Sequence, residues 1–447
     1  MHRRRLSHPV RRLAALAGSA ALALTLIPGT SQAAAQDPHR TAEPARAVLP
    51  ANDGWGATGR GVSGGSAADG AHIYTVTTRS ELATALEKGG DTPKIIRIKG
   101  TIDANTDTRG NPLSCDDYAT DGYTLESYLK AYDPATWGHE MPSGPMEDAR
   151  LASAANQAES VVLPVGSNTT IIGAGRDARL LGASLRVQGA HNVIIRNLTF
   201  EDAYDCFPQW DGTNEGEWNS EYDSVVLSGS THVWVDHNTF TDGRRPDNRQ
   251  PSYLGALYQQ HDGLLDIVRG ADLTTVTWNV FTQHSKSILI GNSDKAAATD
   301  HGKLRTTFHH NLFQDVGERV PRVRFGQVDV YNNHYRQQPG AAYHYGYSWG
   351  IGHESALVAE HNAFTLPAGT TPAGTIHRWN PGTSMTEARN HINGRPADLL
   401  TAYNDAHPDA PLGDDAGWTP SLRPRVDHPR SVPGLVNAHA GAGKLRR

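Results

Sequence analysis

Cysteine is scarce in this chain of 447 residues, which contains only two, Cys115 and Cys206. So few cysteines exclude a small scaffold built on disulfides. A bridge between the two would close a loop of about 90 residues and contribute at most roughly 4 to 5 kcal/mol through the entropy of the unfolded chain. Two buried free thiols are the alternative, and the sequence leaves both open.

Long apolar runs are also rare. The longest, at residues 13–27, is too short to span a bilayer, and no later stretch qualifies. It follows an arginine-rich start and precedes the small residues of 31–35, an arrangement typical of a secretory signal. We therefore predict a signal peptide at 1–35, a secreted, extracellular protein and no membrane partner.

The chain has no excess of positive charge. Its net charge is −6, and removal of residues 1–35 with their five arginines makes it −11. A chain with this charge has no general attraction for polyanions, so nucleic acid is not an expected partner. An anionic ligand would need a local basic patch or a metal ion.

Short apolar runs recur from about residue 168, each followed by an asparagine, a spacer residue and an aromatic residue, as in HVWVDHNTF. Successive asparagines are 22 to 41 residues apart, which is typical of stacked turns with loop insertions. The asparagines are Asn197, Asn238, Asn279, Asn311, Asn333 and Asn362.

These runs are rich in β-branched and aromatic residues, which favour strands. Almost no Asn-Gly hairpin turns separate them. The predicted fold is all-β: a right-handed parallel β-helix with long loop insertions and a few short peripheral helices, one of them at 80–87 with a serine cap. In such a coil the asparagines bond to one another and the aromatic rings stack inside. A β-sandwich or a propeller is the alternative, although propeller blades repeat more evenly.

The sequence predicts a flexible leader at 36–51, because that stretch is rich in alanine and proline. The remainder, 52–447, is predicted to form one β-helical domain.

Acidic residues open two consecutive predicted turns, with Asp223 in one and Asp262 and Asp266 in the next. Three neighbouring carboxylates repel one another unless a hard cation such as Ca2+ joins them. Four extended residues would separate the α-carbons of the last two by roughly 13 Å, too far for one ion unless the chain bends at Gly263. Solvated loop acids are the alternative.

Three arginines lie within the segment GERVPRVRFG, at Arg319, Arg322 and Arg324. Guanidinium groups this close need open solvent or an anion to face. If the chain is extended from Arg322 onward, the second and third share one face, and Val323 and Phe325 share the other. A solvated basic strand edge is the alternative.

Four segments together closely resemble the Ca2+-dependent pectate lyases of polysaccharide lyase family 1. They are YDSVVLSGSTHVWVDHNTFTDG, QHDGLLDI, SKSILIGNSD and ERVPRVRFGQ, and they occur in the expected order. The resemblance covers most of the chain after residue 35. It implies a parallel β-helix that cleaves polygalacturonate by β-elimination.

The resemblance also implies a role for six residues. The calcium ligands would be Asp223, Asp262 and Asp266, the catalytic base Arg319, and the residues that bind substrate carboxylates Lys286 and Arg324. Arginine normally has a pKa above about 12, and we expect the neighbouring cations to lower that of the base. An alkaline rate optimum follows.

Other functions remain open beside the predicted pectate lyase, a secreted monomer that releases 4,5-unsaturated oligogalacturonates. Pectin lyases act on esterified polymer and lack the acidic cluster. A polygalacturonase-type glycoside hydrolase would need two carboxylates flanking the scissile bond. A non-catalytic β-helical protein could bind the polysaccharide without cleaving it.

Overall fold

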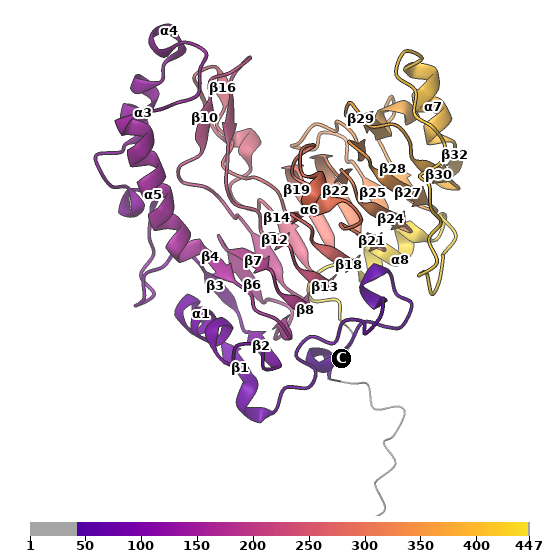
Figure 1. Ribbon diagram of the computed structural model, residues 1–447, viewed down its shortest axis with the longest axis horizontal. Helices are drawn as coiled ribbons and strands as arrows, with labels where there is room; N and C mark the ends of the chain where they lie inside the picture. The colour runs from indigo at the N-terminus through magenta and orange to yellow at the C-terminus, as the bar shows by residue number, and fades with distance from the viewer. Residues whose placement is uncertain (1–42, 446–447) are drawn as a thin grey trace, which may run out of the picture. The chain divides into compact units, whose positions relative to one another are not determined.

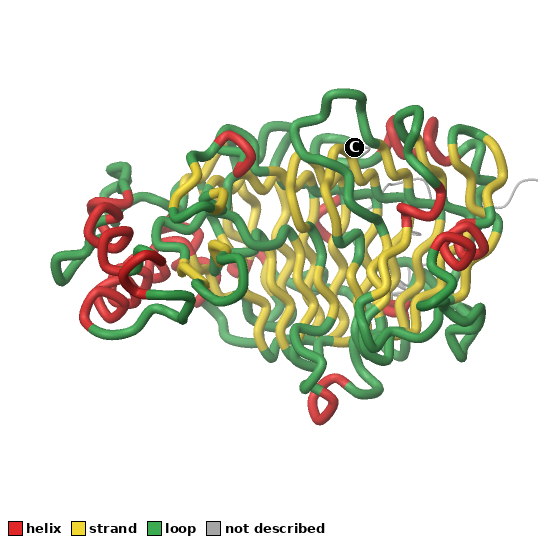
Figure 2. Tube along the Cα trace, turned by 90° about the horizontal axis from the view of Figure 1, so that it is seen from above, coloured by secondary structure: helices red, strands yellow, loops and turns green. Residues whose placement is uncertain are grey.

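Three sheets of almost entirely parallel strands form the core of the chain, whose computed structural model describes residues 43–445. Each complete turn contributes one strand to each sheet, in the same order along the chain. Strands of successive turns therefore lie side by side in rows, with loops beyond their ends (Figure 2). The predicted parallel β-helix is confirmed, whereas the predicted signal peptide lies outside the described residues.

The three sheets contain ten, eight and ten strands. Sheet 1 consists of β1 (Ile73–Val76), β2 (Lys94–Ile98), β5 (Thr169–Gly173), β8 (His191–Arg196), β13 (Thr231–Asp236), β18 (Asp272–Thr277), β21 (Thr306–His309), β24 (Gln327–Tyr331), β27 (Ala356–Glu360) and β30 (Thr386–Ala388). Sheet 2 consists of β4 (Val162–Pro164), β7 (Ser184–Gln188), β12 (Val225–Ser228), β17 (Leu265–Val268), β20 (Leu289–Ile290), β23 (Arg322–Val323), β26 (Trp349–Ile351) and β29 (Ile376–Arg378). Sheet 3 consists of β3 (Thr101–Asp103), β6 (Arg179–Leu181), β9 (Thr199–Glu201), β14 (Thr239–Thr241), β19 (Val280–Lys286), β22 (Leu312–Glu318), β25 (His334–Arg336), β28 (Ala363–Thr365), β31 (Asn390–Ile392) and β32 (Arg395–Ala397), of which the last pairs antiparallel.

Short elements decorate this coil, as the sequence predicts (Figure 1). Two small hairpins are formed by β10 (Gln209–Asp211) with β11 (Glu217–Asn219) and by β15 (Ser252–Tyr253) with β16 (Ala256–Leu257). The helices are α1 (Arg79–Glu87), α2 (Cys115–Tyr118), α3 (Leu125–Ala131), α4 (Pro134–Trp137), α5 (Pro145–Val161), α6 (Ala297–Asp300), α7 (Leu399–Ala406) and α8 (Val432–His439). None of the helices within residues 43–445 combines the length and apolar content that a membrane crossing requires.

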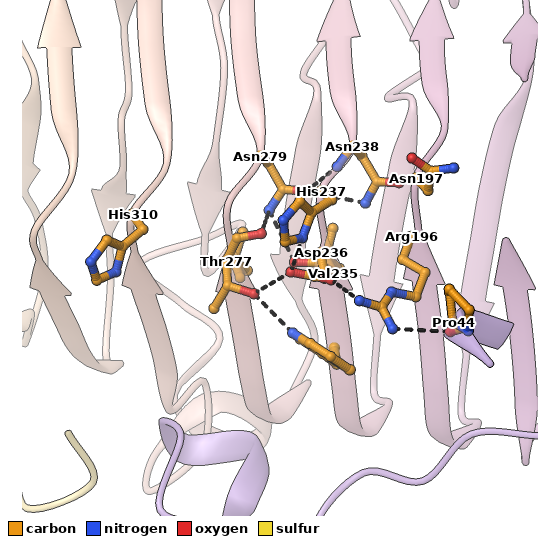
Figure 3. Close-up of polar contacts among 12 residues, drawn as sticks. Pro44, Arg196, Asn197, Val235, Asp236, His237, Asn238, Thr277, Asn279 and His310 are labelled. Carbon is orange, nitrogen blue, oxygen red and sulfur yellow. Dashed lines mark hydrogen bonds and ion pairs between the residues drawn. The ribbon is translucent and has the colours of Figure 1, made fainter. Parts of the chain in front are cut away.

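Buried asparagines form a ladder where each turn passes from sheet 1 to sheet 3. The backbone N–H of Asn238 donates to Oδ1 of Asn279 at 2.8 Å (Figure 3). That of Asn279 donates to Oδ1 of Asn311 at 2.9 Å. The same bond links the later members, which are Asn333, Asn362 and Asn390. A residue with positive φ precedes each asparagine, such as His237 at 53° and Trp278 at 55°. The predicted ladder is therefore confirmed for these turns.

Asn197 was predicted to belong to this ladder, and that prediction is wrong. Its φ is 58°, and because Arg196 pairs with Asp236, Asn197 lies at the level of His237. The ladder position of this turn is Leu198, whose N–H donates to Oδ1 of Asn238. This turn differs by one residue because Asn197 itself occupies the left-handed conformation, which asparagine tolerates.

Aromatic rings stack inside the coil, as predicted. Six rings of sheet 3 follow one another at centroid distances of 4.5 to 5.2 Å, with planes within 17° of parallel. They belong to Phe200, Phe240, Phe281, Phe313, Tyr335 and Phe364. This column fixes the vertical register of the turns that carry the charged residues.

Two local predictions need correction. Helix α1 is capped by Thr78 in a capping box with Glu81, and Ser80 lies inside the helix. The predicted leader at 36–51 is packed from residue 43 onward, where Ala45 and Leu49 are 4% and 6% exposed. Composition alone does not reveal this packing, because these apolar side chains find partners only on the finished coil.

Candidate active site

The three predicted acidic residues lie together at the start of two neighbouring strands of sheet 2. Asp223 precedes β12, Asp262 precedes β17 and Asp266 is the second residue of β17. Because β12 and β17 pair in parallel, the side chain of Asp223 reaches the next turn and accepts a hydrogen bond from the N–H of Gly263 at 2.6 Å. The expected cluster is thus formed across two turns.

Gly263 brings two of these carboxylates within reach of one cation. A Cβ at this position would lie 2.5 Å from Oδ1 of Asp223 and 2.7 Å from Oδ1 of Asp266. The two oxygens therefore border one small space. The glycine is needed here because of this close approach.

The acidic cluster lines an open groove of about 420 Å³. Burial, together with Asp266 and Asp262, raises the pKa of Asp223 well above its usual range. Burial and Asp262 raise the pKa of Asp266 to about 7. The three carboxylates repel one another when ionised, and a cation between them would relieve that repulsion. Carboxylate oxygens are hard donors of the kind that Ca2+ prefers.

Lys286 joins the acidic cluster from sheet 3. It ends β19, and its Nζ lies 3.1 Å from Oδ1 of Asp262. In the next turn it pairs with Glu318, the residue before Arg319. The backbone N–H of Ile288 donates to the carbonyl of Arg319 at 2.8 Å. The turn that carries Lys286 and β20 therefore lies between the acidic residues of β17 and the arginine segment around β23.

The three predicted arginines have different partners. Arg319 pairs with Glu318 at 3.1 Å, and Arg324 pairs with Asp294 at 2.5 Å. Nη1 of Arg324 also donates to the carbonyl of Gly291 at 2.8 Å. The predicted division of faces is confirmed, because Val323 and Phe325 are buried while the arginines remain partly exposed.

Arg322 is held differently from the other two. Its guanidinium carbon lies 3.7 Å from the ring centroid of Trp379. In sheet 2 Arg322 pairs with Leu289 of β20. Strand β20 pairs in turn with β17, which carries Asp266. Arg322 thus continues the row that begins at the acidic cluster.

We expected neighbouring cations to lower the pKa of Arg319. The charged side chains around it raise this pKa instead, so the expectation is wrong. Burial alone lowers this pKa, but Glu318, Tyr347 and the acidic cluster outweigh burial, and the pKa is raised. The lowered pKa belongs to Arg322, where burial and the other two arginines bring it to about 10. The sequence does not show which arginine has carboxylates facing it.

The pectate lyase family model matches residues 28–129 and 145–410. This chain belongs to the pectate lyase family. It is 44% identical over 402 residues to the pectate lyase of Bacillus subtilis (strain 168), covering 89% of this chain and 93% of that protein. Pectate lyase E of Dickeya dadantii (strain 3937) is 40% identical over 323 residues, covering 72% and 69%.

Solved structures agree with this family. A pectate lyase bound to a hexasaccharide has a TM-score of 0.87 and 44% identity, covering 91% of this chain and 100% of that chain. A thermostable pectate lyase has a TM-score of 0.88 and 43% identity, covering 90% and 100%. The predicted enzyme class, a polysaccharide lyase, is confirmed.

A second group of acids with a histidine lies beneath the groove of the lyase. Asp242, Asp247 and His261 have ligand atoms within 4.8 Å of one another. Both ring nitrogens of His261 face carboxylates, with Nδ1 2.8 Å from Asp247 and Nε2 3.1 Å from Asp202. Burial alone would lower the pKa of His261, but these acids raise it to about 10. His261 is therefore held in a buried ion-pair network with these carboxylates.

Sequence reasoning missed several groove residues of the lyase. Arg186, Gln188, Glu221 and Asn292 line the groove beside the acidic cluster. Arg186 pairs with Val226, and Val226 pairs with Asp266, so all three share one row of sheet 2. Only the strand register reveals that row. Adjacent strand residues are expected to point to opposite faces, but the positive φ of His237 ends the strand, and its Nδ1 lies 2.7 Å from Asp236 (Figure 3).

Proposed function

We propose that this lyase cleaves polygalacturonate by calcium-assisted β-elimination and releases 4,5-unsaturated oligogalacturonates. The observation that carries this proposal is the approach of the Asp223 and Asp266 oxygens around Gly263, with the turn that carries Lys286 between them and the arginine segment. Acidic groups beside basic groups suit a polyanionic sugar only if a cation joins the acids to it.

The residues that would hold Ca2+ are Asp223, Asp262 and Asp266. Their support is the chemistry of the donor set and the raised pKa of Asp223 and of Asp266. Burial raises both pKa values first and the neighbouring carboxylates add to it, and a cation would neutralise that crowded charge. When bound, Ca2+ supplies positive charge that stabilises the negative charge developing on the uronate carboxylate.

Lys286 and Arg324 would bind carboxylates of the polymer. Each has a carboxylate partner now, Asp262 and Asp294 respectively, so each already carries the geometry of such an ion pair. Substrate carboxylates would exchange with these partners and hold the sugar chain in register.

Arg319 would take the proton from C5 of the uronate. Its segment lies next to the turn that carries Lys286, two turns beyond Asp266 along sheet 2. A raised pKa leaves only a small neutral fraction at pH 7, so an alkaline rate optimum is expected.

We also infer that the enzyme is secreted and acts as a monomer. The inference of secretion rests on the arginine-rich start and the small residues at 31–35. For action along a polymer, a monomer is the simpler form.

The test incubates the enzyme with polygalacturonate and Ca2+, and in parallel with a chelator. We expect ultraviolet absorbance of an unsaturated product with Ca2+ and none with chelator. New reducing ends without absorbance would indicate hydrolysis, and unchanged polymer would indicate a binding protein. Faster reaction on methyl-esterified polymer would indicate a pectin lyase.

A further inference from the structure

A buried histidine links the two halves of the proposed site from below. We propose that His284 is a positioning residue that fixes Asp262 and Lys286 relative to each other, and through them the calcium requirement of the enzyme. This inference rests on the proposed function, because it concerns the same carboxylate and the same ammonium group. His284 itself lies beneath the groove, with its side chain 0% exposed.

One nitrogen of His284 contacts both segments. Its Nε2 lies 2.8 Å from the carbonyl oxygen of Asp262 and 3.0 Å from that of Lys286. Carbonyl oxygens only accept hydrogen bonds, so Nε2 carries a proton that both oxygens share. A single N–H thus sets the distance between two backbone segments from different turns.

The other nitrogen of His284 anchors the ring. Nδ1 lies 2.6 Å from Oδ1 of Asp242, whose side chain is 1% exposed. Both ring nitrogens therefore face acceptors, two carbonyl oxygens on one side and a buried carboxylate on the other. Contacts on both sides hold the ring orientation firmly.

Asp242 is itself fixed from a third segment. The hydroxyl of Tyr343, from the loop between β25 and β26, donates to Oδ2 of Asp242 at 2.5 Å. The same hydroxyl accepts from the N–H of Asp247 at 2.8 Å. Both oxygens of Asp242 are therefore engaged, and the ring of His284 has little freedom to turn.

The side chains above repeat this connection. Nζ of Lys286 lies 3.1 Å from Oδ1 of Asp262, so the two residues are joined at the backbone by His284 and at the side chains by an ion pair. A cation at Asp262 must compete with this ammonium group. If His284 lets the two segments move apart, both the metal ligand and the substrate-binding ammonium lose their positions.

A purely structural role is the competing explanation, because any buried ion pair supports stability. Two variants separate the roles. His284→Gln keeps an N–H near Nε2 and loses the bond to Asp242, whereas His284→Asn keeps an N–H near Nδ1 and loses the bonds to Asp262 and Lys286. His334→Gln is the control, since His334 is a buried histidine that contacts Thr365 away from the groove.

The measurements are the Ca2+ concentration for half-maximal activity, KM and kcat on polygalacturonate, Ca2+ binding by calorimetry, and thermal melting. We expect His284→Asn to raise the half-activating Ca2+ concentration about 10- to 100-fold. We expect His284→Gln to raise it much less, and His334→Gln to leave it unchanged. The kcat at saturating Ca2+ should fall less than the Ca2+ affinity.

The inference is overturned if both His284 variants melt at lower temperature but keep the Ca2+ requirement of the unaltered enzyme. It is also overturned if Gln is impaired more than Asn. Should neither variant fold, Tyr343→Phe loosens Asp242 alone, and an unchanged Ca2+ requirement in that variant overturns the inference. Failure of the proposed function is seen separately, in unaltered enzyme that gives no Ca2+-dependent product.

Discussion

Two carboxylates from neighbouring turns press against the backbone of Gly263. They belong to Asp223 and Asp266, and the first accepts a hydrogen bond from the Gly263 N–H. A side chain at this position would force both carboxylates outward, because a Cβ cannot lie 2.5 Å from an oxygen. The absence of one side chain thus permits the close approach of two others.

Gly263→Ala should weaken Ca2+ activation. Displaced carboxylates cannot serve one cation equally well, so the half-activating Ca2+ concentration should rise on the order of tenfold or more. The measurement is a Ca2+ titration of lyase activity. Gly434→Ala is the matched control, since nothing lies within 4 Å of the Cβ it would add. An unchanged titration for Gly263→Ala would contradict the proposed cation position.

Arg319→Lys should lose most turnover but still bind polygalacturonate. The lysine ammonium cannot take the place of the guanidinium as the base, and loss of a general base lowers the rate on the order of 10²- to 10⁴-fold. Lys286 and Arg324 continue to bind substrate carboxylates. The measurements are kcat and a binding isotherm. Near-normal turnover would show that Arg319 is not the base.

The rate of the unaltered enzyme should rise with pH through the alkaline range. The pKa of Arg319 is raised, so below it the neutral fraction of the guanidinium increases tenfold for each pH unit. The measurement is kcat against pH at saturating Ca2+. A plateau already reached at pH 6 would contradict the assignment.

Each turn of the coil depends on polar groups that only another turn can satisfy. Nδ2 of Asn311 donates to the carbonyl of Val276 at 2.9 Å and to Oδ1 of Asn333 at 2.9 Å. Oδ1 of Asn311 accepts from the N–H of Asn279. One buried side chain therefore serves the turns before and after its own, and the strands stay in register.

Asn311→Ala should destabilise the fold by about 2 to 5 kcal/mol, because several buried backbone groups would lose their partners at about 1 to 3 kcal/mol each. The measurement is unfolding in urea. Asn248→Ala is the control, since the exposed Asn248 makes one bond to the carbonyl of Ala342. An equal effect of the two substitutions would contradict the ladder's contribution.

Asp236 links three turns in the same region (Figure 3). It contacts Arg196 at 2.6 Å and His237 at 2.7 Å, and it accepts from Thr277 at 2.9 Å. Burial alone would raise its pKa, but His237 and Arg196 outweigh burial and lower it to about 2. The ionised carboxylate therefore stabilises the folded chain above the pKa of the unfolded chain.

Asp236→Asn should lower stability by about 3 to 5 kcal/mol at pH 6, because the buried Arg196 loses its charged partner. This difference should shrink as the pH falls from about 4 toward 2, where the unaltered carboxylate becomes protonated. Denaturant unfolding at pH 6, 4 and 3 measures it. A difference that stays constant over this range would contradict the linkage.

The disulfide ties the coil to the helices that decorate it. Cys115 in α2 is bonded to Cys206, which follows β9, across a sequence separation of 91. Around it, aromatic residues of α3 and β10 form a cluster separate from the interior of the coil, including Tyr128 and Trp210. The bridge therefore lowers the conformational entropy that this segment has in the unfolded chain, and the segment itself lies outside the stacked turns.

Replacing both cysteines with serine should lower stability by at most about 4 to 5 kcal/mol, the loop-entropy value for a closure of this length. Thermal melting measures the loss. A reducing agent should lower the melting temperature of the unaltered protein and leave the variant unaffected. Equal melting of variant and unaltered protein would contradict a stabilising bridge.

The sequence by itself determined the type of fold and the chemical groups of the site. Short apolar runs followed by an asparagine and an aromatic residue predict stacked turns, because those preferences act within a few residues. The acidic and arginine motifs can also be recognised in the sequence. The structure brings Asp223, Asp262 and Asp266 together as predicted.

Only the tertiary structure decided what depends on distances between turns. The one-residue slip at Asn197, the space at Gly263 and the raised pKa of Arg319 each follow from residues far apart in sequence. The buried contacts of His284 with Asp262 and Asp242 do so as well. Hydrogen bonds and charge interactions act over a few ångströms, so they exist only once the coil has brought those turns side by side.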